Sequence, residues 1–163
     1  MTTDTVSSPR SLLVLLSYHH KNTEKVANVF AKILAAPIQS PEQLSPSEVG
    51  GYYLVGFGSG IYDGMHHKAL LEFADKLPDA NGKKAFLFST SAIISDDKVA
   101  KDHAALREKL RSKGYDIVDE FACKGFNTNS FLKLFGGINK GRPNAEDLES
   151  AKRFAIRLRG VAT

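Results

Sequence analysis

The chain has 163 residues, of which 42% are hydrophobic and 25% charged, and its formal net charge is +4 at pH 7. These values are typical of one globular domain with a buried core, and they exclude a disordered chain. No apolar run approaches the roughly 20 residues of a membrane helix, and a single cysteine, Cys123, excludes an internal disulfide and favours a reducing cytoplasm.

Short β-rich apolar runs alternate with helical patterns along the chain. LLVLL at 12–16 is a continuous apolar run, which predicts a strand covered on both faces. Residues 22–35 then carry apolar side chains at helical spacing, and similar pairs of segments follow. In chain order, the prediction is strand 12–16, helix 22–35, a short strand near Ile38, strand 52–59, helix 66–77, strand 84–91, helix 102–113, strand 116–123 and a last helix capped by Asn144.

This alternation predicts a doubly wound α/β domain with a parallel sheet and helices on both faces. We place the domain at residues 11–160. The segment before it, residues 1–10, matches neither a secretory signal nor a transit peptide, and we expect a flexible tail there. Lysines and arginines are scattered among acids, which indicates solvated helix faces and no nucleic-acid site.

Polar and aromatic residues gather where four of the predicted strands end. In an open α/β sheet, ligands bind outside the carboxyl ends of the strands, near the point where strand order reverses. A ligand site is therefore expected at one edge of the sheet. The residues predicted to bind there are Ser17, His19, Lys21, Asn22, Thr23, Ser59, Gly60, Ile61, Tyr62, Ser89, Thr90, Ser91, Cys123 and Phe126.

The turn SYHHKNTE, residues 17–24, lies between the first strand and the first helix. A helix N-terminus offers unpaired N–H groups and about half a positive charge, which suits a phosphate monoester. The hydroxyls of Ser17 and Thr23 and the imidazole of His19 add hydrogen-bond donors. The alternative is that Asn22 or Thr23 simply caps the helix and the histidines face solvent.

The pattern from Ser17 to Asn22-Thr23-Glu24 resembles the phosphate loop of flavodoxins, Ser/Thr-x-Thr-Gly-Asn-Thr-Glu. YYLVGFGSGIY (52–62) resembles the third strand and first flavin loop of that family, and KKAFLFSTS resembles its fourth strand and second flavin loop. The resemblance covers almost the whole chain. It implies a flavodoxin-like, three-layer α/β/α fold with five parallel strands in the order 2-1-3-4-5, holding FMN.

The resemblance also implies roles within the site. Tyr62, or else Phe126, is expected to stack on the flavin ring, the Gly60–Ile61 peptide to meet its N5, and residues 89–91 to bond its polar edge. The loop glycine of the family is Lys21 here. We therefore expect the phosphate contact to depend on His19 and Lys21, and FMN binding to weaken as His19 loses its proton.

Three other features have competing interpretations. His66 and His67 are predicted to begin a helix at the cofactor mouth, where either side chain can donate a proton to a reduced acceptor; a zinc site is disfavoured because no carboxylate stands at ligand spacing, and no metal is expected. Cys123 is either a core residue or a redox thiol beside the flavin. The connection 124–143 is expected to cover the flavin or bind a substrate or partner, or else to form a short helix with its own small core.

These features predict an FMN-binding redox protein. As an oxidoreductase it would move hydride from NAD(P)H to a quinone or a similar acceptor. As an electron carrier it would pass single electrons between a reductase and a redox partner protein. A flavin-free binding module with the same fold is the third interpretation.

Overall fold

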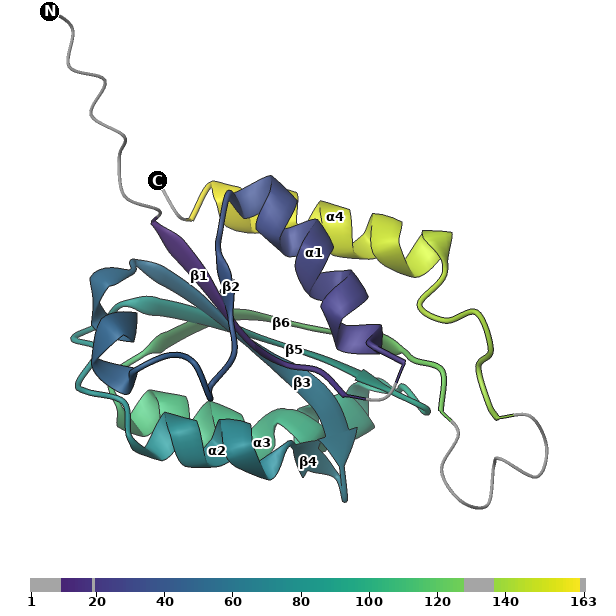
Figure 1. Cartoon of the computed structure of the whole chain (residues 1–163), viewed down its shortest axis with the longest axis horizontal. Helices are drawn as coiled ribbons and strands as arrows, with labels where there is room; N and C mark the ends of the chain where they lie inside the picture. The colour runs from purple at the N-terminus through teal and green to yellow at the C-terminus, as the bar shows by residue number, and fades with distance from the viewer. Residues whose placement is uncertain (1–9, 19, 128–136, 162–163) are drawn as a thin grey trace, which may run out of the picture.

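The computed structural model describes residues 10–18, 20–127 and 137–161, and it has three layers (Figure 1). A central sheet is covered by α1 and α4 on one face and by α2 and α3 on the other. The elements in chain order are β1 (Ser11–Leu16), α1 (Asn22–Leu34), β2 (Ile38–Gln39), the 3-10 helix η1 (Pro46–Gly51), β3 (Leu54–Tyr62), β4 (Met65–His66), α2 (Lys68–Asp75), β5 (Lys84–Ser91), α3 (Asp96–Ser112), β6 (Asp116–Lys124) and α4 (Ala145–Arg159).

The strand order is β2-β1-β3-β5-β6, and these strands pair in parallel. The sequence analysis did not predict the short strand β4, so its third, fourth and fifth strands are β3, β5 and β6. The observed order is then the predicted 2-1-3-4-5, and the predicted fold is confirmed. The additional strand β4 is antiparallel to β3. The order reverses between β1 and β3, so the carboxyl ends of these two strands mark the edge where a ligand site is expected.

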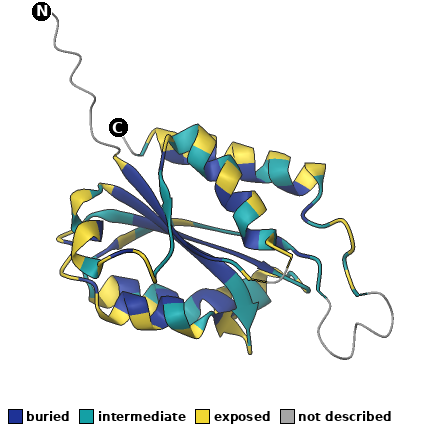
Figure 2. Cartoon of the chain, in the orientation of Figure 1, coloured by how far each residue is buried: buried dark blue, intermediate teal, exposed yellow. Residues whose placement is uncertain are grey.

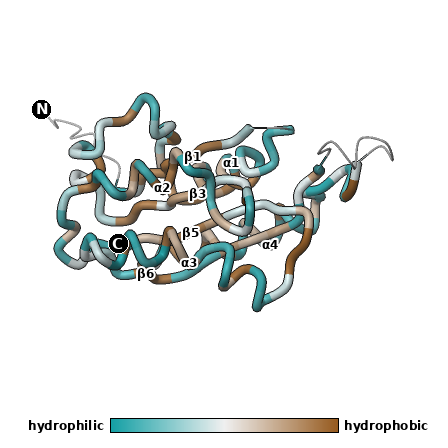
Figure 3. Tube along the Cα trace, turned by 90° about the horizontal axis from the view of Figure 1, so that it is seen from below, coloured by the Kyte–Doolittle hydropathy of each residue, from teal (hydrophilic) through white to brown (hydrophobic). Residues whose placement is uncertain are grey.

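Two hydrophobic clusters separate the layers, one on each face of the sheet. Figure 2 shows the buried sides of the helices turned toward the strands, and Figure 3 shows hydrophobic stretches along the central strands. On the α1/α4 face, glycines of β3 make room for aromatic rings of β5. A Cβ on Gly56 would lie 2.3 Å from the Phe86 ring, and one on Gly58 would lie 2.2 Å from the Phe88 ring. These glycines are therefore required by packing.

The structure corrects the sequence prediction at the carboxyl end of β3. The strand does not end at 59 but continues to Tyr62, turns on Asp63 and Gly64, and returns as β4. Asp63 and Gly64 have φ angles of 50° and 75°, a left-handed pair that closes a tight hairpin. The predicted flavin loop after residue 59 is thus part of a β-hairpin, and α2 starts at Lys68 rather than at His66.

Helix α3 begins six residues earlier than predicted. The hydroxyl of Ser95 accepts a hydrogen bond from the Lys98 N–H at 3.2 Å, and two aspartates, Asp96 and Asp97, occupy the first turn. A serine cap followed by acidic residues stabilises a helix start. The predicted start at Asp102 did not take this cap into account.

Two predicted segments lie largely outside the described residues. They are the tail at 1–10, of which only Arg10 is described, and the middle of the 124–143 connection, residues 128–136. The described ends of that connection meet, because Asn127 and Ile138 form an antiparallel bridge. The Asn139 amide donates a hydrogen bond to the Ala92 carbonyl at 2.6 Å, which ties this segment to the end of β5.

Candidate functional site

The turn between β1 and α1 has an unusual backbone. His20 and Lys21, with φ angles of 56° and 53°, both adopt the left-handed conformation. Each such non-glycine residue costs roughly 1–3 kcal/mol, and strain of this kind concentrates at functional sites. Lys21 is the N-cap of α1 without a side-chain cap, whereas the alternative prediction named Asn22 or Thr23. The Ser17 hydroxyl takes the place of an N-cap side chain, because it accepts a hydrogen bond from the Glu24 N–H at 3.2 Å. The predicted phosphate-binding residue His19 lies outside the described residues.

The Asn22 side chain joins this turn to the segment after β6. Its Nδ2 donates to the Phe126 carbonyl at 2.7 Å, while its Oδ1 is buried and has no hydrogen-bond partner among the described residues. A Cβ on Gly125 would lie 2.7 Å from that Nδ2, so this position requires a glycine. A buried acceptor without a donor is costly, by about 1–3 kcal/mol. A ligand with a hydroxyl or N–H donor at this position would give Asn22 Oδ1 its missing hydrogen bond.

Several hydroxyls predicted to face a cofactor are bonded within the protein. The hydroxyls of Thr23 and Thr90 lie 2.9 Å apart and both residues are buried. Ser59 accepts from the His67 N–H at 3.0 Å and donates to its neighbour's carbonyl, and Ser89 contacts His103 at 2.7 Å. Ser59 is internal because β3 continues to Tyr62, past the predicted strand end, whereas Ser89 and Thr90 lie within β5, whose bounds are as predicted. Ser91 is less buried, and its hydroxyl donates to the Ile93 carbonyl at 2.8 Å.

Aromatic rings flank the β1–α1 turn on both sides. On one side the His67 ring lies 5.0 Å from Tyr62, nearly perpendicular to it, and 5.3 Å from Tyr18. On the other side the rings of His20 and Phe126 are 4.3 Å apart. Tyr18 is 46% exposed and was missed by the sequence analysis, although its place between Ser17 and the histidine pair was the available signal. Its hydroxyl donates to Glu42 at 3.1 Å.

The two adjacent histidines have different environments. His66 is 1% exposed, and its Nε2 donates to the Phe88 carbonyl at 3.2 Å. Burial, with the nearby His103 as second cause, lowers the pKa of His66 to about 3. The predicted position of His66 at the exposed start of a helix is therefore wrong, because the residue belongs to β4. His67 is the N-cap of α2; its Nδ1 accepts from the Ala69 N–H at 3.0 Å, and partial burial lowers its pKa.

Cys123 is a core residue. It is 6% exposed and packs in the cluster beneath α1 and α4, where burial raises the pKa of its thiol to about 12. A thiol in that state is neither a nucleophile nor an effective metal ligand. The interpretation as a core residue is thus supported over the redox thiol.

Direct contacts connect the ends of four strands at this edge. Thr23 meets Thr90, Asn22 meets Phe126, and the Gly125 N–H donates to the Ser91 carbonyl at 3.0 Å. The ring contacts of His67 add the β3–β4 hairpin. We call these surroundings of the β1–α1 turn the strand-end site. Among the described residues, no group of three or more His, Cys, Asp or Glu side chains is arranged to hold a metal ion.

A cavity of about 260 Å³ opens beside the strand-end site, toward β2. Its lining includes Ser17 and Tyr18 from the turn, Glu24 from α1, and Glu42 and Gln43 from the segment after β2. The turn therefore borders an open space as well as the aromatic rings. Within the described ranges, no helix is long and apolar enough to cross a membrane.

Solved structures with the same architecture identify the fold. A flavodoxin from the domain Archaea superposes with a TM-score of 0.69 at 18% identity, over 93% of this chain and 97% of that chain. Flavodoxin 2 from Bacillus cereus gives 0.69 at 20% identity, over 90% and 95%. An NADH:FMN oxidoreductase (EMOB) in its apo form gives 0.65 at 17% identity, over 94% and 90%. The chain has a flavodoxin-like fold.

Sequence comparison then places the chain in a family. No family model matches it. The "Uncharacterized protein MJ0298" of Methanocaldococcus jannaschii is 47% identical over 146 residues, which cover 90% of this chain and 95% of that protein. The chain belongs to the same family as this archaeal protein.

Proposed function

We propose that the chain is an FMN-binding redox protein and that the strand-end site holds the cofactor. The observation that carries the proposal is the state of the β1–α1 turn, which combines left-handed backbone at His20 and Lys21 with an unpartnered buried acceptor on Asn22. Such strain and such an unpaired group are retained where a ligand compensates for them. The fold supports the location, because ligands of doubly wound sheets bind at this edge.

The residues present fit the phosphate and ribityl portions of FMN. The first turn of α1 offers backbone N–H groups and the positive end of the helix dipole to a phosphate, and Lys21 adds a cation at the N-cap. Asn22 Oδ1 accepts hydrogen bonds only, so it suits a ribityl hydroxyl rather than the phosphate itself. The predicted hydroxyl contacts at Thr23 and Thr90 are replaced in this proposal by backbone and amide groups.

The aromatic side chains fit the ring portion. Tyr62 and His67 on one side of the turn and Phe126 on the other offer flat surfaces that exclude water, and Tyr18 joins the first of these. The cofactor, when bound, supplies one- and two-electron chemistry. Because His67 Nδ1 accepts from Ala69, its Nε2 carries the hydrogen in the neutral ring and can donate it to a ligand.

Two redox roles remain, an NAD(P)H-dependent oxidoreductase with a quinone-type acceptor and an electron carrier for a partner protein. The net charge of +4 suits an anionic donor such as NAD(P)H and equally an acidic partner protein, so the two roles are separated by kinetics. Rapid reduction of the FMN-loaded protein by NADH or NADPH, followed by reoxidation with a quinone, supports the oxidoreductase. Slow reduction by both nucleotides supports the carrier.

Titration with FMN, followed by the loss of flavin fluorescence, tests cofactor binding itself. We expect Asn22→Leu to weaken FMN binding by about tenfold or more, because one hydrogen bond is worth about 1–1.5 kcal/mol and its loss leaves partners unpaired. Asn28→Leu is the matched control, since Asn28 is exposed on the same helix. A purified protein that neither contains FMN nor binds it on addition contradicts the proposal and supports the flavin-free binding module.

A further inference from the structure

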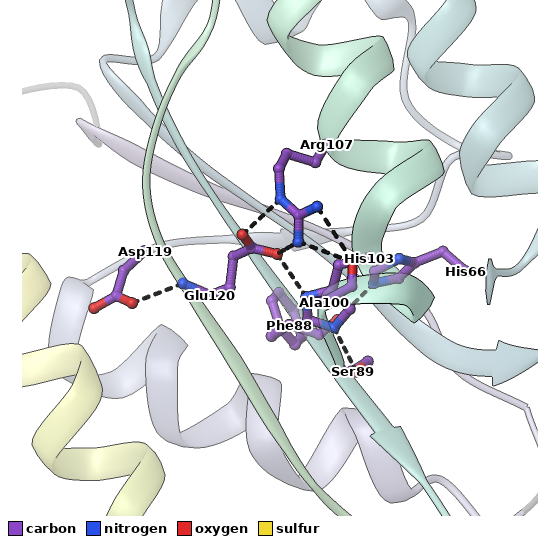
Figure 4. Close-up of polar contacts among 8 residues, drawn as sticks. All are labelled: His66, Phe88, Ser89, Ala100, His103, Arg107, Asp119 and Glu120. Atoms are coloured by element: carbon purple, nitrogen blue, oxygen red, sulfur yellow. Dashed lines mark hydrogen bonds and ion pairs between the residues drawn. The ribbon is translucent and has the colours of Figure 1, made fainter. Parts of the chain in front are cut away.

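A chain of hydrogen-bonded polar side chains lies next to His66 of β4, on the α2/α3 face of the sheet (Figure 4). We call it the buried polar chain: it consists of His103 and Ser89, which are buried, and Arg107 and Glu120, which are partly buried. Arg107 donates to both oxygens of Glu120, at 2.8 and 2.7 Å; His103 Nδ1 lies 2.9 Å from Glu120 and its Nε2 lies 2.7 Å from the Ser89 hydroxyl. The four side chains come from α3, β5 and β6.

The chemistry of the groups gives this chain a direction. Burial alone would raise the pKa of Glu120, but hydrogen bonds from His103 and Arg107 outweigh it and hold the pKa at about 2. The carboxylate therefore only accepts, and His103 Nδ1 carries a hydrogen. In the neutral ring, Nε2 then accepts from the Ser89 hydroxyl. Glu120 thus fixes the hydrogen of the neutral His103 ring on Nδ1, and the Ser89 hydroxyl donates to the free Nε2.

The hydroxyl–imidazole–carboxylate order resembles that of a nucleophilic triad, but burial excludes that use. Ser89 is 2% exposed and His103 is 0% exposed, so the Ser89 oxygen is not presented to a substrate. A hydrogen-bonded network whose centre is buried instead fixes the relative positions of the elements that contribute to it.

The hairpin rests on this chain through His66. The His66 ring lies 4.7 Å from the His103 ring, and its Nε2–H is bonded to the carbonyl of Phe88, the residue before Ser89. The next residue, His67, is held by its N–H to Ser59 at 3.0 Å. Near the hairpin turn stands Asp102 of α3, which is paired with Lys98; a Cβ on Gly64 would lie 3.9 Å from it.

The geometry points to a positioning role: the buried polar chain, acting through His66, fixes the β3–β4 hairpin so that Tyr62 and His67 face the strand-end site, and it thereby sets the affinity of that site for the flavin ring. This inference rests on the proposed function. His103 and Ser89 are positioning residues in it, since neither reaches the strand-end site itself.

The pair Ser89→Val and Ser89→Thr tests the inference, because both variants add the same methyl volume and only threonine keeps the hydroxyl. In the FMN-free protein, we expect Ser89→Val to speed amide hydrogen exchange of residues 61–66 by tenfold or more relative to Phe57 in the same strand. Ser89→Thr is expected to restore slow exchange. FMN affinity should fall about tenfold in Ser89→Val and return in Ser89→Thr.

Glu120→Ala is a second variant, and it removes the acceptor of His103 Nδ1. Nitrogen-15 chemical shifts of the imidazole report whether the ring hydrogen leaves Nδ1, and hairpin exchange should again accelerate. Ser112→Ala, an exposed change on α3, is the control. Unchanged hairpin exchange, or a loosened hairpin with unchanged FMN affinity, overturns the inference. A wild-type protein that does not bind FMN overturns the proposed function instead, while exchange in the FMN-free protein still shows whether the chain holds the hairpin.

Discussion

The β1–α1 turn and the buried polar chain lie on opposite faces of the same sheet and are built in opposite ways. In the turn, His20 and Lys21 occupy left-handed backbone and Asn22 keeps an unpartnered buried oxygen. In the chain, each ring nitrogen of His103 and both oxygens of Glu120 have partners. Strain and an unpaired group indicate a place that awaits a ligand, whereas full pairing indicates support. The contrast applies to the four members of the chain, since His66, which connects them to the hairpin, has a buried Nδ1 without a partner among the described residues.

Removing the carboxylate of the buried polar chain should have the largest effect. Glu120→Leu leaves His103 and Arg107 without the carboxylate that they share. Because the Arg107 and Glu120 side chains are 18% and 24% exposed, the cost is at the low end for a buried ion pair, roughly 2–3 kcal/mol of unfolding free energy. Urea denaturation measures it. Glu108→Leu on the exposed side of α3 is the matched control and should stay within about 0.5 kcal/mol of wild type. Equal effects of the two substitutions would show that the chain is not a supporting element.

Acid should destabilise the folded protein through the same region. The folded pKa of His66 is about 3, below its ordinary 6.5, so the unfolded state binds a proton first as the pH falls. Stability is therefore lost below pH 6.5, by about 2 kcal/mol between pH 7 and pH 5. Glu120, with a pKa of about 2, adds a further loss below pH 4.5.

Urea unfolding at pH 7 and pH 5 checks this dependence. His66→Gln removes the titrating ring and should flatten the loss between these two values. His20→Gln, which changes an exposed histidine, is measured alongside as the control. If the His66 variant loses as much stability as wild type over this interval, the acid sensitivity arises elsewhere.

The sequence was sufficient to predict the strand order of the sheet, but it did not predict the β3–β4 hairpin or the buried polar chain. Alternating strands and helices, together with the resemblance of 17–24 and 52–62 to flavodoxin loops, predicted the strand order that the structure shows. The hairpin was missed because β4 has only two residues, Met65 and His66, too few for any periodic signal. Its turn chemistry, Asp-Gly at 63–64, was present in the sequence and was the signal available.

Glu120 was missed for a different reason. A register shift opposite Ala85 and Phe86 inserts one extra residue into β6, so that Ile117 packs on the α2/α3 face and Phe121 on the α1/α4 face. The shift reverses the alternation of side chains, which brings Glu120 onto the face of His103. A pattern of period two cannot reveal such a reversal, because the bulge depends on pairing with another strand.

The smallest expected effect belongs to Lys21→Gly. This substitution distinguishes the cost of backbone strain in the β1–α1 turn from the contribution of the lysine side chain to ligand binding. Lys21 stands where the flavodoxin pattern has glycine, and its φ of 53° is one that glycine adopts freely. Lys21→Gly should therefore raise the unfolding free energy by about 1 kcal/mol. At the same time it should weaken FMN binding several-fold, because a cation beside the proposed phosphate position is lost. Stability from urea denaturation and affinity from FMN titration give the two values.

Ala35 supplies the matched control for Lys21. It caps the other end of α1 with a φ of 50°, and it is likewise exposed. Ala35→Gly should give a similar gain in stability with no change in FMN affinity, because it lies a full helix length from the turn. If Lys21→Gly behaves like Ala35→Gly in both measurements, the lysine has no part in anion binding. The strand-end site would then rely on the helix start and on Asn22 for its hold on the phosphate and ribityl groups.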